Sequence, residues 1–498
     1  MNNILKNLKF SVFNYIVVNL LKFVVRIVLV RHLSIEYLGI DGLFRNILAV
    51  LSLAELGVGP AIVYSLYKPL ALGDNEAVKS IMNLFKKLYV SIGLVIGALG
   101  LCLYPFLDSF IKDKPNIADL NYFYLLFLLN TVVSYFWSYQ RNLLIADKKL
   151  YFVNAYQAIV QVVVAVAQII GLILFQSYWC FIVLMLLGTV VENFAIAQKA
   201  YVEYPYIKEE SCELDKSVLS EIVKNTKAMV IHKLAGIIVF SSSNIILSKF
   251  VGLVAVGLYS NYYMVITVMN TLAGKLFEAI TANVGHILVV NDEEKQVQSF
   301  NVMEFVTALQ ASVMSVGMYV LFNPFITLWL GKEFLFDKAT VICLVVLFYL
   351  MFMRKAVLLY RDASGLFWQD RYKAIAEMII NLVATIYLAQ HYGVLGVVCG
   401  GIISTLLTCF WLEPFILFRY SLPISLSDYF LDYFKYTALT VMCALSLDYV
   451  SQTFIKNYSI ISFLLFGSCI VIFVGLVWLA LFRNREEVVF LRKKLLKC

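Results

Sequence analysis

Long apolar stretches follow one another along the whole chain, each bounded by charged residues, proline or glycine. An α-helix needs about 20 apolar residues to cross the hydrocarbon core of a bilayer. The pattern therefore predicts an all-α, polytopic membrane protein with about fourteen transmembrane helices. Two of the boundaries rest on tight turns, in the segments FQSYW and QHYG. The predicted spans are 10–31, 42–67, 88–110, 120–140, 153–175, 178–198, 227–248, 253–274, 302–326, 339–361, 374–391, 394–418, 433–452 and 457–482.

Composition and charge agree with this class of protein. Hydrophobic residues make up 62% of the chain and the mean hydropathy is +0.84, far outside the range of soluble globular proteins. In a soluble protein the net charge of +8 would suggest a nucleic-acid partner. Here lysine and arginine favour one side of the predicted spans by about four to one, as the positive-inside rule requires. Both termini are therefore predicted to be cytoplasmic, and no nucleic acid is expected as a partner.

A short internal repeat predicts two lobes. The segment GLFRN at 42–46 recurs as GLYSN at 257–261, in both cases after a preceding span and a short outer loop. The offset equals six spans, which favours two six-helix lobes in the same orientation and an added helix pair. The predicted organisation is an N-terminal six-helix lobe at 1–199, a cytoplasmic linker at 200–226, a C-terminal six-helix lobe at 227–420, an extra helix pair at 421–482 and a basic cytoplasmic tail at 483–498.

The first two predicted spans carry ionisable residues at depths where the membrane makes them costly. Lys22 and Arg26 are four residues apart and share one helix face. Arg45 opens the returning helix at a similar depth, and Glu55 lies deeper, just before the glycines and proline that interrupt the span. We interpret the three cations as the lining of a basic, water-accessible pocket, with Glu55 as a coupling or gating residue.

A purely structural interpretation of the same residues stays open. Arg26 and Arg45 would then extend to the outer headgroups, and Lys22 would pair with Glu55 as a packing contact. Lys233, in the seventh span, would either continue the cationic lining or reach the inner headgroups.

Amide side chains at membrane depth in later spans are candidates for contact with sugars. Gln157, Gln161 and Gln168 fall on one face of the fifth predicted helix, and Asn261 belongs to the repeated segment. We select Gln157, Gln161 and Asn261 as sugar-contact candidates. Hydrogen bonds between helices would use the same groups, so both interpretations stand.

No feature of the sequence indicates a metal, a cofactor or a catalytic centre. The four histidines lack ligand spacing, and the nine cysteines include no CxxC pair. No phosphate loop, nucleophile elbow or zinc signature occurs. A membrane-embedded glycosyltransferase or polymerase would need acid and base groups at a membrane face, but the outer cluster of Asp108, Asp113 and Asp119 is interpreted as a solvated turn. A scaffold would leave the buried charges without a role. We therefore predict a transporter and not an enzyme.

Two stretches carry a family resemblance. The run YLGIDGLFRNILAVLSLAELGVGPAIVYSLYKPLALGDNEAVKSIMNLFKK and the later SNIILSKFVGLVAVGLYSNYYMV resemble the polysaccharide flippases of the Wzx type, in the multidrug/oligosaccharidyl-lipid/polysaccharide exporter (MOP) superfamily. The resemblance extends to about position 420 and implies two six-helix lobes around a central cavity. It also implies alternating access and movement of undecaprenyl-diphosphate-linked oligosaccharide from the inner to the outer leaflet of the bacterial cytoplasmic membrane, for capsule, O-antigen or exopolysaccharide synthesis.

The resemblance also implies a site and partners. The added helix pair is similar to that of the lipid II flippases, in which basic residues of the first two spans serve the diphosphate. Lys22, Arg26, Arg45 and Lys233 are assigned to the diphosphate on this basis and on their depth in the membrane. The implied partners are the lipid-linked oligosaccharide and membrane lipids, with a polysaccharide polymerase and other envelope-assembly proteins as candidates. No cofactor is expected, and sodium, protons or the membrane potential stay open as the energy source.

One departure and one alternative bear on the mechanism. Many members of the family carry an acidic residue where this chain has Asn244, so no ion-coupling role is assigned there. A cation-coupled multidrug antiporter of the same superfamily is the alternative function. Such an antiporter should line its cavity with carboxylates and aromatic rings, whereas the leading hairpin of this chain is predominantly basic.

Overall fold

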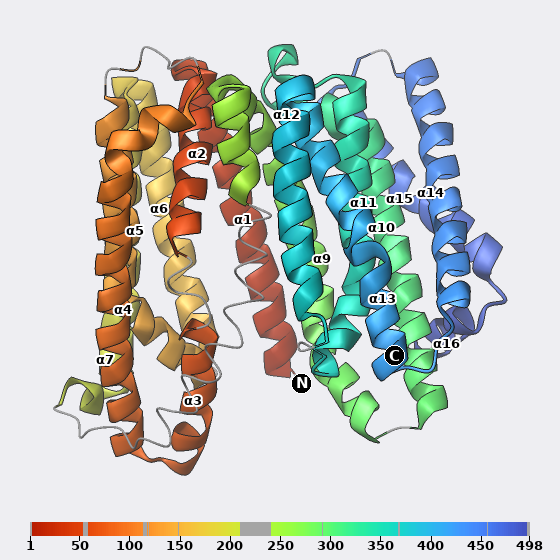
Figure 1. The fold of residues 1–498 in the computed structure, drawn as a ribbon, viewed down its shortest axis with the longest axis horizontal. Coiled ribbons are helices and arrows are strands. Elements are labelled where there is room, and N and C mark those ends of the chain that lie inside the picture. Colours follow the sequence, from red (N-terminus) through yellow and green to blue (C-terminus); the bar gives the residue numbers. More distant parts are fainter. Residues whose placement is uncertain are drawn as a thin grey trace. The chain divides into compact units, whose positions relative to one another are not determined.

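The computed structural model describes residues 2–52, 58–112, 117, 119–147, 149–209, 241–290, 292–366, 369–455 and 457–495. Over these residues the regular structure is helical and contains no strand (Figure 1). Nine stretches within the same residues are long and apolar enough to cross a membrane. The predicted all-α membrane fold is confirmed, whereas the count of fourteen spans stays a prediction.

The chain divides into two compact units, Met1–Gly257 and Leu258–Cys498. Residues 241–250 are helical and fall in the first unit, and α9 begins there and continues into the second. The first unit contains α1 (Asn2–His32), α2 (Ile35–Leu51), α3 (Val58–Leu72), α4 (Asn75–Leu103), α5 (Leu120–Ala146), α6 (Leu150–Phe175) and α7 (Tyr178–Glu203), with short 3₁₀ turns at Tyr104–Phe110 and Pro205–Lys208. The second contains α9 (Leu253–Val290), α10 (Glu293–Trp329), a 3₁₀ turn at Lys332–Phe334, α11 (Lys338–Ala363), α12 (Arg371–Leu407), α13 (Cys409–Tyr420), α14 (Leu426–Phe454), α15 (Ile460–Phe482) and α16 (Glu486–Leu495).

Several helices begin earlier than their predicted spans, and α2 and α4 show the reason. The second predicted span starts at 42, but α2 begins at Ile35, directly after Ser34 in an extended conformation. The repeated GLFRN segment therefore lies inside α2, and Arg45 does not open the helix. The third predicted span starts at 88, but α4 begins at Asn75. The carboxylate of Asp74, the residue before it, accepts a hydrogen bond of 2.9 Å from the backbone amide of Ala77. Hydropathy finds the apolar part of a helix, whereas the cap sets its first residue.

The two predicted tight turns are confirmed. Gln176 connects α6 to α7 in the left-handed conformation, with φ of 47°. Gly393 interrupts α12 with φ of 58° and ψ of −129°. The following predicted span, 394–418, is not continuous, because the backbone leaves helical geometry at Thr408 and α13 starts at Cys409. Pro414 lies inside α13, where it lacks the amide that helical hydrogen bonding requires.

The starts of α2 and α9 meet inside the first unit. A Cβ atom on Gly39 of α2 would lie 2.2 Å from the carbonyl oxygen of Leu253, and one on Gly257 of α9 would lie 2.8 Å from the carbonyl oxygen of Ile35. Only glycine permits backbones to approach this closely. The first turns of α2 and α9 therefore cross at a pair of glycines.

A second contact explains why residues 241–257, which the sequence assigns to the C-terminal lobe, belong to the first compact unit. The amide of Lys112 donates to the carbonyl of Ser248 at 2.9 Å, and its ammonium donates to the carbonyl of Phe250 at 3.1 Å. Since residues 210–240 lie outside the described part of the chain, the lobe and linker boundaries stay a prediction.

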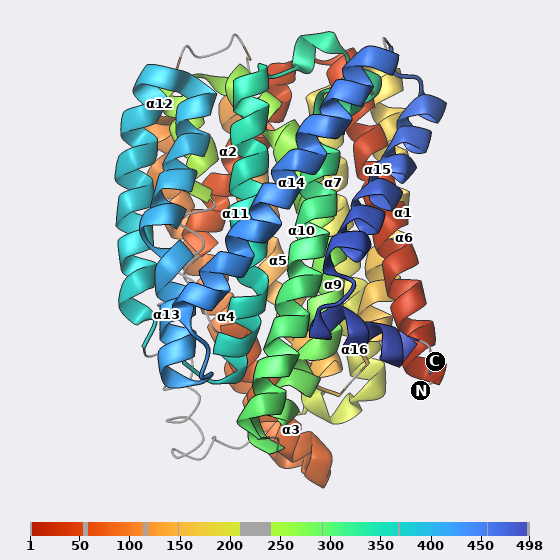
Figure 2. The same ribbon diagram turned by 90° about the vertical axis from the view of Figure 1, so that its right-hand side faces the viewer.

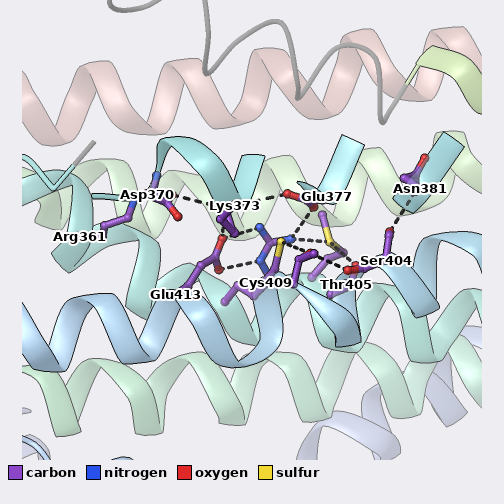
Figure 3. A network of polar contacts seen from close by, with 12 residues as sticks. Arg361, Asp370, Lys373, Glu377, Asn381, Ser404, Thr405, Cys409 and Glu413 are labelled. Carbon is purple, nitrogen blue, oxygen red and sulfur yellow. Dashed lines mark hydrogen bonds and ion pairs between the residues drawn. The ribbon is translucent and has the colours of Figure 1, made fainter. Parts of the chain in front are cut away.

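The second unit is built around α10, against which α11, α14, α15 and α16 pack (Figure 2). Its α11, α12 and α13 are joined by a buried ion-pair network (Figure 3). Glu413 of α13 is fully buried and accepts from Arg354 at 2.7 and 2.9 Å and from Lys373 at 2.5 Å. Lys373 also lies 3.4 Å from Asp370, which pairs with Arg361.

Glu377 completes the network, with its Oε1 at 3.6 Å from Arg354. Three cations and three largely buried carboxylates therefore pair with one another among α11, α12 and α13, and we call this set the balanced network. Its members are Arg354, Arg361, Asp370, Lys373, Glu377 and Glu413. At its edge the half-exposed Asp362 also pairs with Arg361, at 2.6 Å.

We expect Gly39→Ala to destabilise the protein, because the new methyl group meets a backbone oxygen that cannot rotate away. Overpacking of this kind costs about 1–3 kcal/mol, measurable as a lower thermal unfolding midpoint of the purified protein. Gly274→Ala on α9 is the control, since a methyl group added there would have open space within 4 Å. Equal midpoints for the two variants would contradict the glycine crossing.

We also expect Glu413→Gln to lower the free energy of unfolding by about 3–5 kcal/mol, because it leaves two buried cations short of a counter-charge. Asp362→Asn is the matched control. Asp362 also pairs with an arginine, at 2.6 Å, but its side chain is 48% exposed, so about 1 kcal/mol or less is expected. Similar thermal shifts for the two variants would show that the balanced network is no more than a set of surface pairs.

Candidate functional site

Arg45 lies on α2 four residues after Asp41, so the two side chains share one helix face. Its Nε is 2.9 Å from both carboxylate oxygens of Asp41, and a terminal nitrogen is 2.8 Å from Oδ1. The guanidinium also lies 5.5 Å from the ring centre of Phe127 and 3.2 Å from the sulfur of Met185. Half of the Arg45 side chain remains exposed. An oriented arginine with an open side is suited to bidentate binding of a phosphate.

The two predicted cations of α1 lie in the same region. Lys22 is exposed, and the charged groups that act on it are Arg45 and Glu192. Arg26 is partly buried, and the carboxylate that acts on it is Asp41. The structure therefore brings together the three cations that the sequence selects from the first hairpin.

Three further members of this site were missed by the sequence analysis. Asp41 is the direct partner of Arg45, and its position four residues earlier was the available signal. Arg141 of α5 donates to Glu192 of α7 at 2.7 Å, with 27% and 13% of their side chains exposed. The sequence placed Arg141 in a cytoplasmic connection because the predicted span ended at 140, whereas α5 continues to Ala146.

We call this group the cationic cluster. It spans α1, α2, α5 and α7 of the first unit, and its four cations face two carboxylates, which leaves an excess of two positive charges. Its members are Lys22, Arg26, Asp41, Arg45, Arg141 and Glu192.

The second unit repeats one part of this arrangement without the charge excess. Arg141 and Glu192 join α5 to α7, and Arg354 and Glu413 join α11 to α13. Arg354 belongs to the fourth predicted span of its lobe, and Arg141 lies one residue beyond the end of the fourth predicted span of the other; both glutamates belong to a sixth predicted span. In the second unit, Lys373 adds a further cation to the glutamate, inside a network whose charges balance.

The other predicted site residues lie as follows. Gln157 and Gln161 are partly buried on α6, whereas the buried Gln168 donates to the carbonyl of Phe181 on α7 at 3.0 Å and so connects two helices. Asn261 is fully buried, and its amide atoms have no hydrogen-bond partner among the described residues. A sugar would reach it only in another conformation. Glu55 and Lys233 lie outside the described residues.

No group of three or more histidine, cysteine, aspartate or glutamate residues that would hold a metal ion occurs in the described part of the chain. The chemistry available in the cationic cluster is binding of an anion by guanidinium and ammonium groups, with carboxylates as competing partners.

Comparison with known proteins places the chain in a family. The model of a polysaccharide biosynthesis protein family matches residues 4–280. No curated protein matches the chain. Among solved structures, the lipid II flippase MurJ in an inward closed conformation is similar, with a TM-score of 0.69 and 14% identity over 95% of this chain and 99% of that chain.

Two transporters share the fold at similar identity. An inward-facing multidrug resistance MATE family transporter of the MOP superfamily has a TM-score of 0.61 and 14% identity, over 80% of this chain and 94% of its own. A MOP superfamily transporter from Pyrococcus furiosus, described by a reverse polarity of its binding pocket, has a TM-score of 0.55 and 14% identity, over 83% and 95%. These similarities establish the fold of a multi-pass membrane transporter. Because the family model matches more than half of the 498 residues, the chain belongs to the polysaccharide biosynthesis protein family.

Proposed function

We propose that this protein flips an undecaprenyl-diphosphate-linked oligosaccharide from the inner to the outer leaflet of the bacterial cytoplasmic membrane by alternating access. The observation that carries the proposal is the excess of two positive charges in the cationic cluster, with half of Arg45 exposed. The family, and the fold shared with a lipid II flippase, support this substrate class.

The charge of the substrate explains why such a cluster is needed. A diphosphate cannot cross hydrocarbon without its water unless cations replace the lost hydration. A lipid-linked diphosphate carries one negative charge on each phosphate, which equals the excess of the cluster. The guanidinium of Arg45 presents a planar fork to a phosphate, and Lys22 adds a mobile point charge.

The two carboxylates give the cluster a way to release its ligand. Asp41 holds Arg45, and Glu192 holds Arg141, when no substrate is bound. A bound diphosphate competes with these carboxylates for the same nitrogens. Re-formation of the ion pairs then offsets part of the free energy of releasing the substrate outside.

The fold alone does not decide between this function and cation-coupled drug export, since multidrug transporters have the same fold. One similar structure is described by a reverse polarity of its binding pocket, so the charge of the pocket has to be taken from the chain itself. In the cationic cluster both carboxylates are paired with arginines, and cations are in excess. This composition favours an anionic substrate.

The oligosaccharide would contact the amides that the sequence selects. Gln157 and Gln161 are partly buried on α6 and are proposed as sugar contacts in this conformation. Asn261 would join them only after a change of conformation, since it is fully buried. Lys233 as a further diphosphate ligand and Glu55 as a coupling or gating residue remain part of the proposal.

We expect Lys22→Ala, Arg26→Ala and Arg45→Ala each to reduce surface polysaccharide in flippase-null cells at matched membrane abundance, with lipid-linked oligosaccharide accumulating inside. Loss of one charge-assisted contact of about 1.5–3 kcal/mol corresponds to a decrease of about tenfold or more. Arg31→Ala is the control, because Arg31 is exposed at the end of α1. Normal export from all three variants would remove the diphosphate site and favour the antiporter.

Glu192→Gln should have the opposite effect on binding, because it removes a carboxylate that competes for Arg141. We expect the purified variant to bind undecaprenyl diphosphate about tenfold more tightly than the wild type, a difference of about 1.4 kcal/mol. Glu76→Gln is the control, since Glu76 is exposed and pairs with the buried Lys79 outside the cluster. Unchanged or weaker binding by Glu192→Gln would contradict competition between carboxylate and diphosphate.

A further inference from the structure

The second unit contains a buried carboxyl group outside the sites described above. Glu304 lies on α10 with 7% of its surface exposed, and its Oε1 atom has no hydrogen-bond partner among the described residues. It belongs neither to the balanced network nor to any ion pair in the described part of the chain. An ionised carboxylate with this burial would be strongly disfavoured in a membrane protein.

The groups that act on Glu304 come from α14, from α16 and from the residue just before α16. They are two acids, Asp432 and Glu487, and one cation, Arg485. Of the two acids, Asp432 has the stronger electrostatic effect on Glu304. Two tyrosines of α14, Tyr429 and Tyr436, also face it. Glu304 therefore meets two acidic groups and one basic group.

The described cation that acts on Glu304, Arg485, is already engaged. The guanidinium of Arg485 donates two hydrogen bonds of 2.6 Å to the carboxylate of Asp432 and one of 3.2 Å to the hydroxyl of Tyr436. Lys435 also donates to Asp432 at 3.0 Å. Burial acts to raise the pKa of Asp432, but the hydrogen bonds from Arg485 and Lys435 prevail and lower it. Asp432 is thus the ionised partner, and a second negative charge on Glu304 would be left without a cation of its own.

The described side chains of α15 and α11 that pack on this part of α10 are aromatic rings and a hydroxyl group. From α15, Trp478 and Phe482 pack on Phe305 at ring distances of 5.4 and 5.8 Å. From α11, the hydroxyl of Tyr360 bonds to that of Ser299 at 2.6 Å. Among the described residues, the surroundings of Glu304 are therefore aromatic apart from Glu487 and the pair of Arg485 and Asp432, which links the residue just before α16 to α14.

We propose that Glu304 is a proton-binding site whose occupancy controls the link between α14 and α16. With the proton bound, Glu304 is neutral and Arg485 stays on Asp432. When the proton leaves to water, the new carboxylate competes for Arg485, and the contact of the tail helix with α14 weakens. The ligand of this site is the proton alone. Its use in driving or regulating export rests on the proposed function, whereas its binding does not.

A structural role alone does not account for this residue. An apolar side chain at the same buried position would avoid the cost of burying an unpaired carboxyl group. Unlike an apolar side chain, a glutamic acid at this position can change its charge by releasing a proton.

The test is an infrared titration of the full-length protein in lipid between about pH 6 and about pH 9, where buried glutamic acids titrate. We expect a neutral-carboxyl band that disappears as pH rises, is absent in Glu304→Gln and persists in the control Glu294→Gln, an exposed acid on the same helix. Arg485→Gln should move the midpoint to higher pH, since it removes the cation that favours the charged form. The same band in wild type and Glu304→Gln would overturn the proposal.

The link to α16 is read out by a spin label placed at Val489 on that helix. We expect its mobility to increase as the wild-type band disappears, and to stay low at every pH in Glu304→Gln. If the mobility of the label changed with pH equally in the wild type and in Glu304→Gln, Glu304 would not control the contact between α14 and α16. Neither measurement uses transport, so loss of the export activity proposed above would leave both results interpretable.

Discussion

The arrangement of charged residues in this protein depends on one constraint: an ionised side chain inside a membrane-spanning helix needs either a counter-charge or water. The balanced network meets the constraint completely, since Glu413 is fully buried between Arg354 and Lys373. The cationic cluster meets it only in part, since its carboxylates are fewer than its cations and Lys22 remains exposed. Under the proposed function the missing charge comes from the bound diphosphate, which replaces water at the exposed cations.

A similar ion pair serves two purposes in the two units. Arg141 pairs with Glu192 in the first unit, and Arg354 pairs with Glu413 in the second. In the second unit Lys373 of α12 also binds the glutamate of the pair, Glu413, which is fully buried. In the first unit no described lysine or arginine bonds to Glu192 besides Arg141, and Lys22 acts on it from an exposed position. A pair that holds helices together in one unit is thus left open to competition in the other.

Hydropathy predicted the fold well because long apolar helices leave a strong periodic signal, and the turns at Gln176 and Gly393 follow from local chemistry. The cations of the first hairpin were found for the same reason, since charges stand out against an apolar background. Their partners were harder to predict. Arg141 lies one residue beyond a predicted span, and its contact with Glu192 joins residues 51 positions apart. Such pairs depend on helix packing, which a single sequence does not contain.

The charge excess has a consequence for the energy source under the proposed function. A diphosphate moving outward from a negative interior gains about 2.3 kcal/mol per charge per 100 mV if it crosses the whole field. Bound to a cluster with an equal positive excess, however, the loaded site is close to neutral and responds little to the potential. The empty cluster keeps its positive charge, so a negative interior favours its return to the inward-facing state. The membrane potential would therefore act mainly on the return of the empty transporter to the inward-facing state. Protonation of Glu304 would add a second control. Because Glu304 is not a member of the cationic cluster, this control would leave the charge of the binding site unchanged.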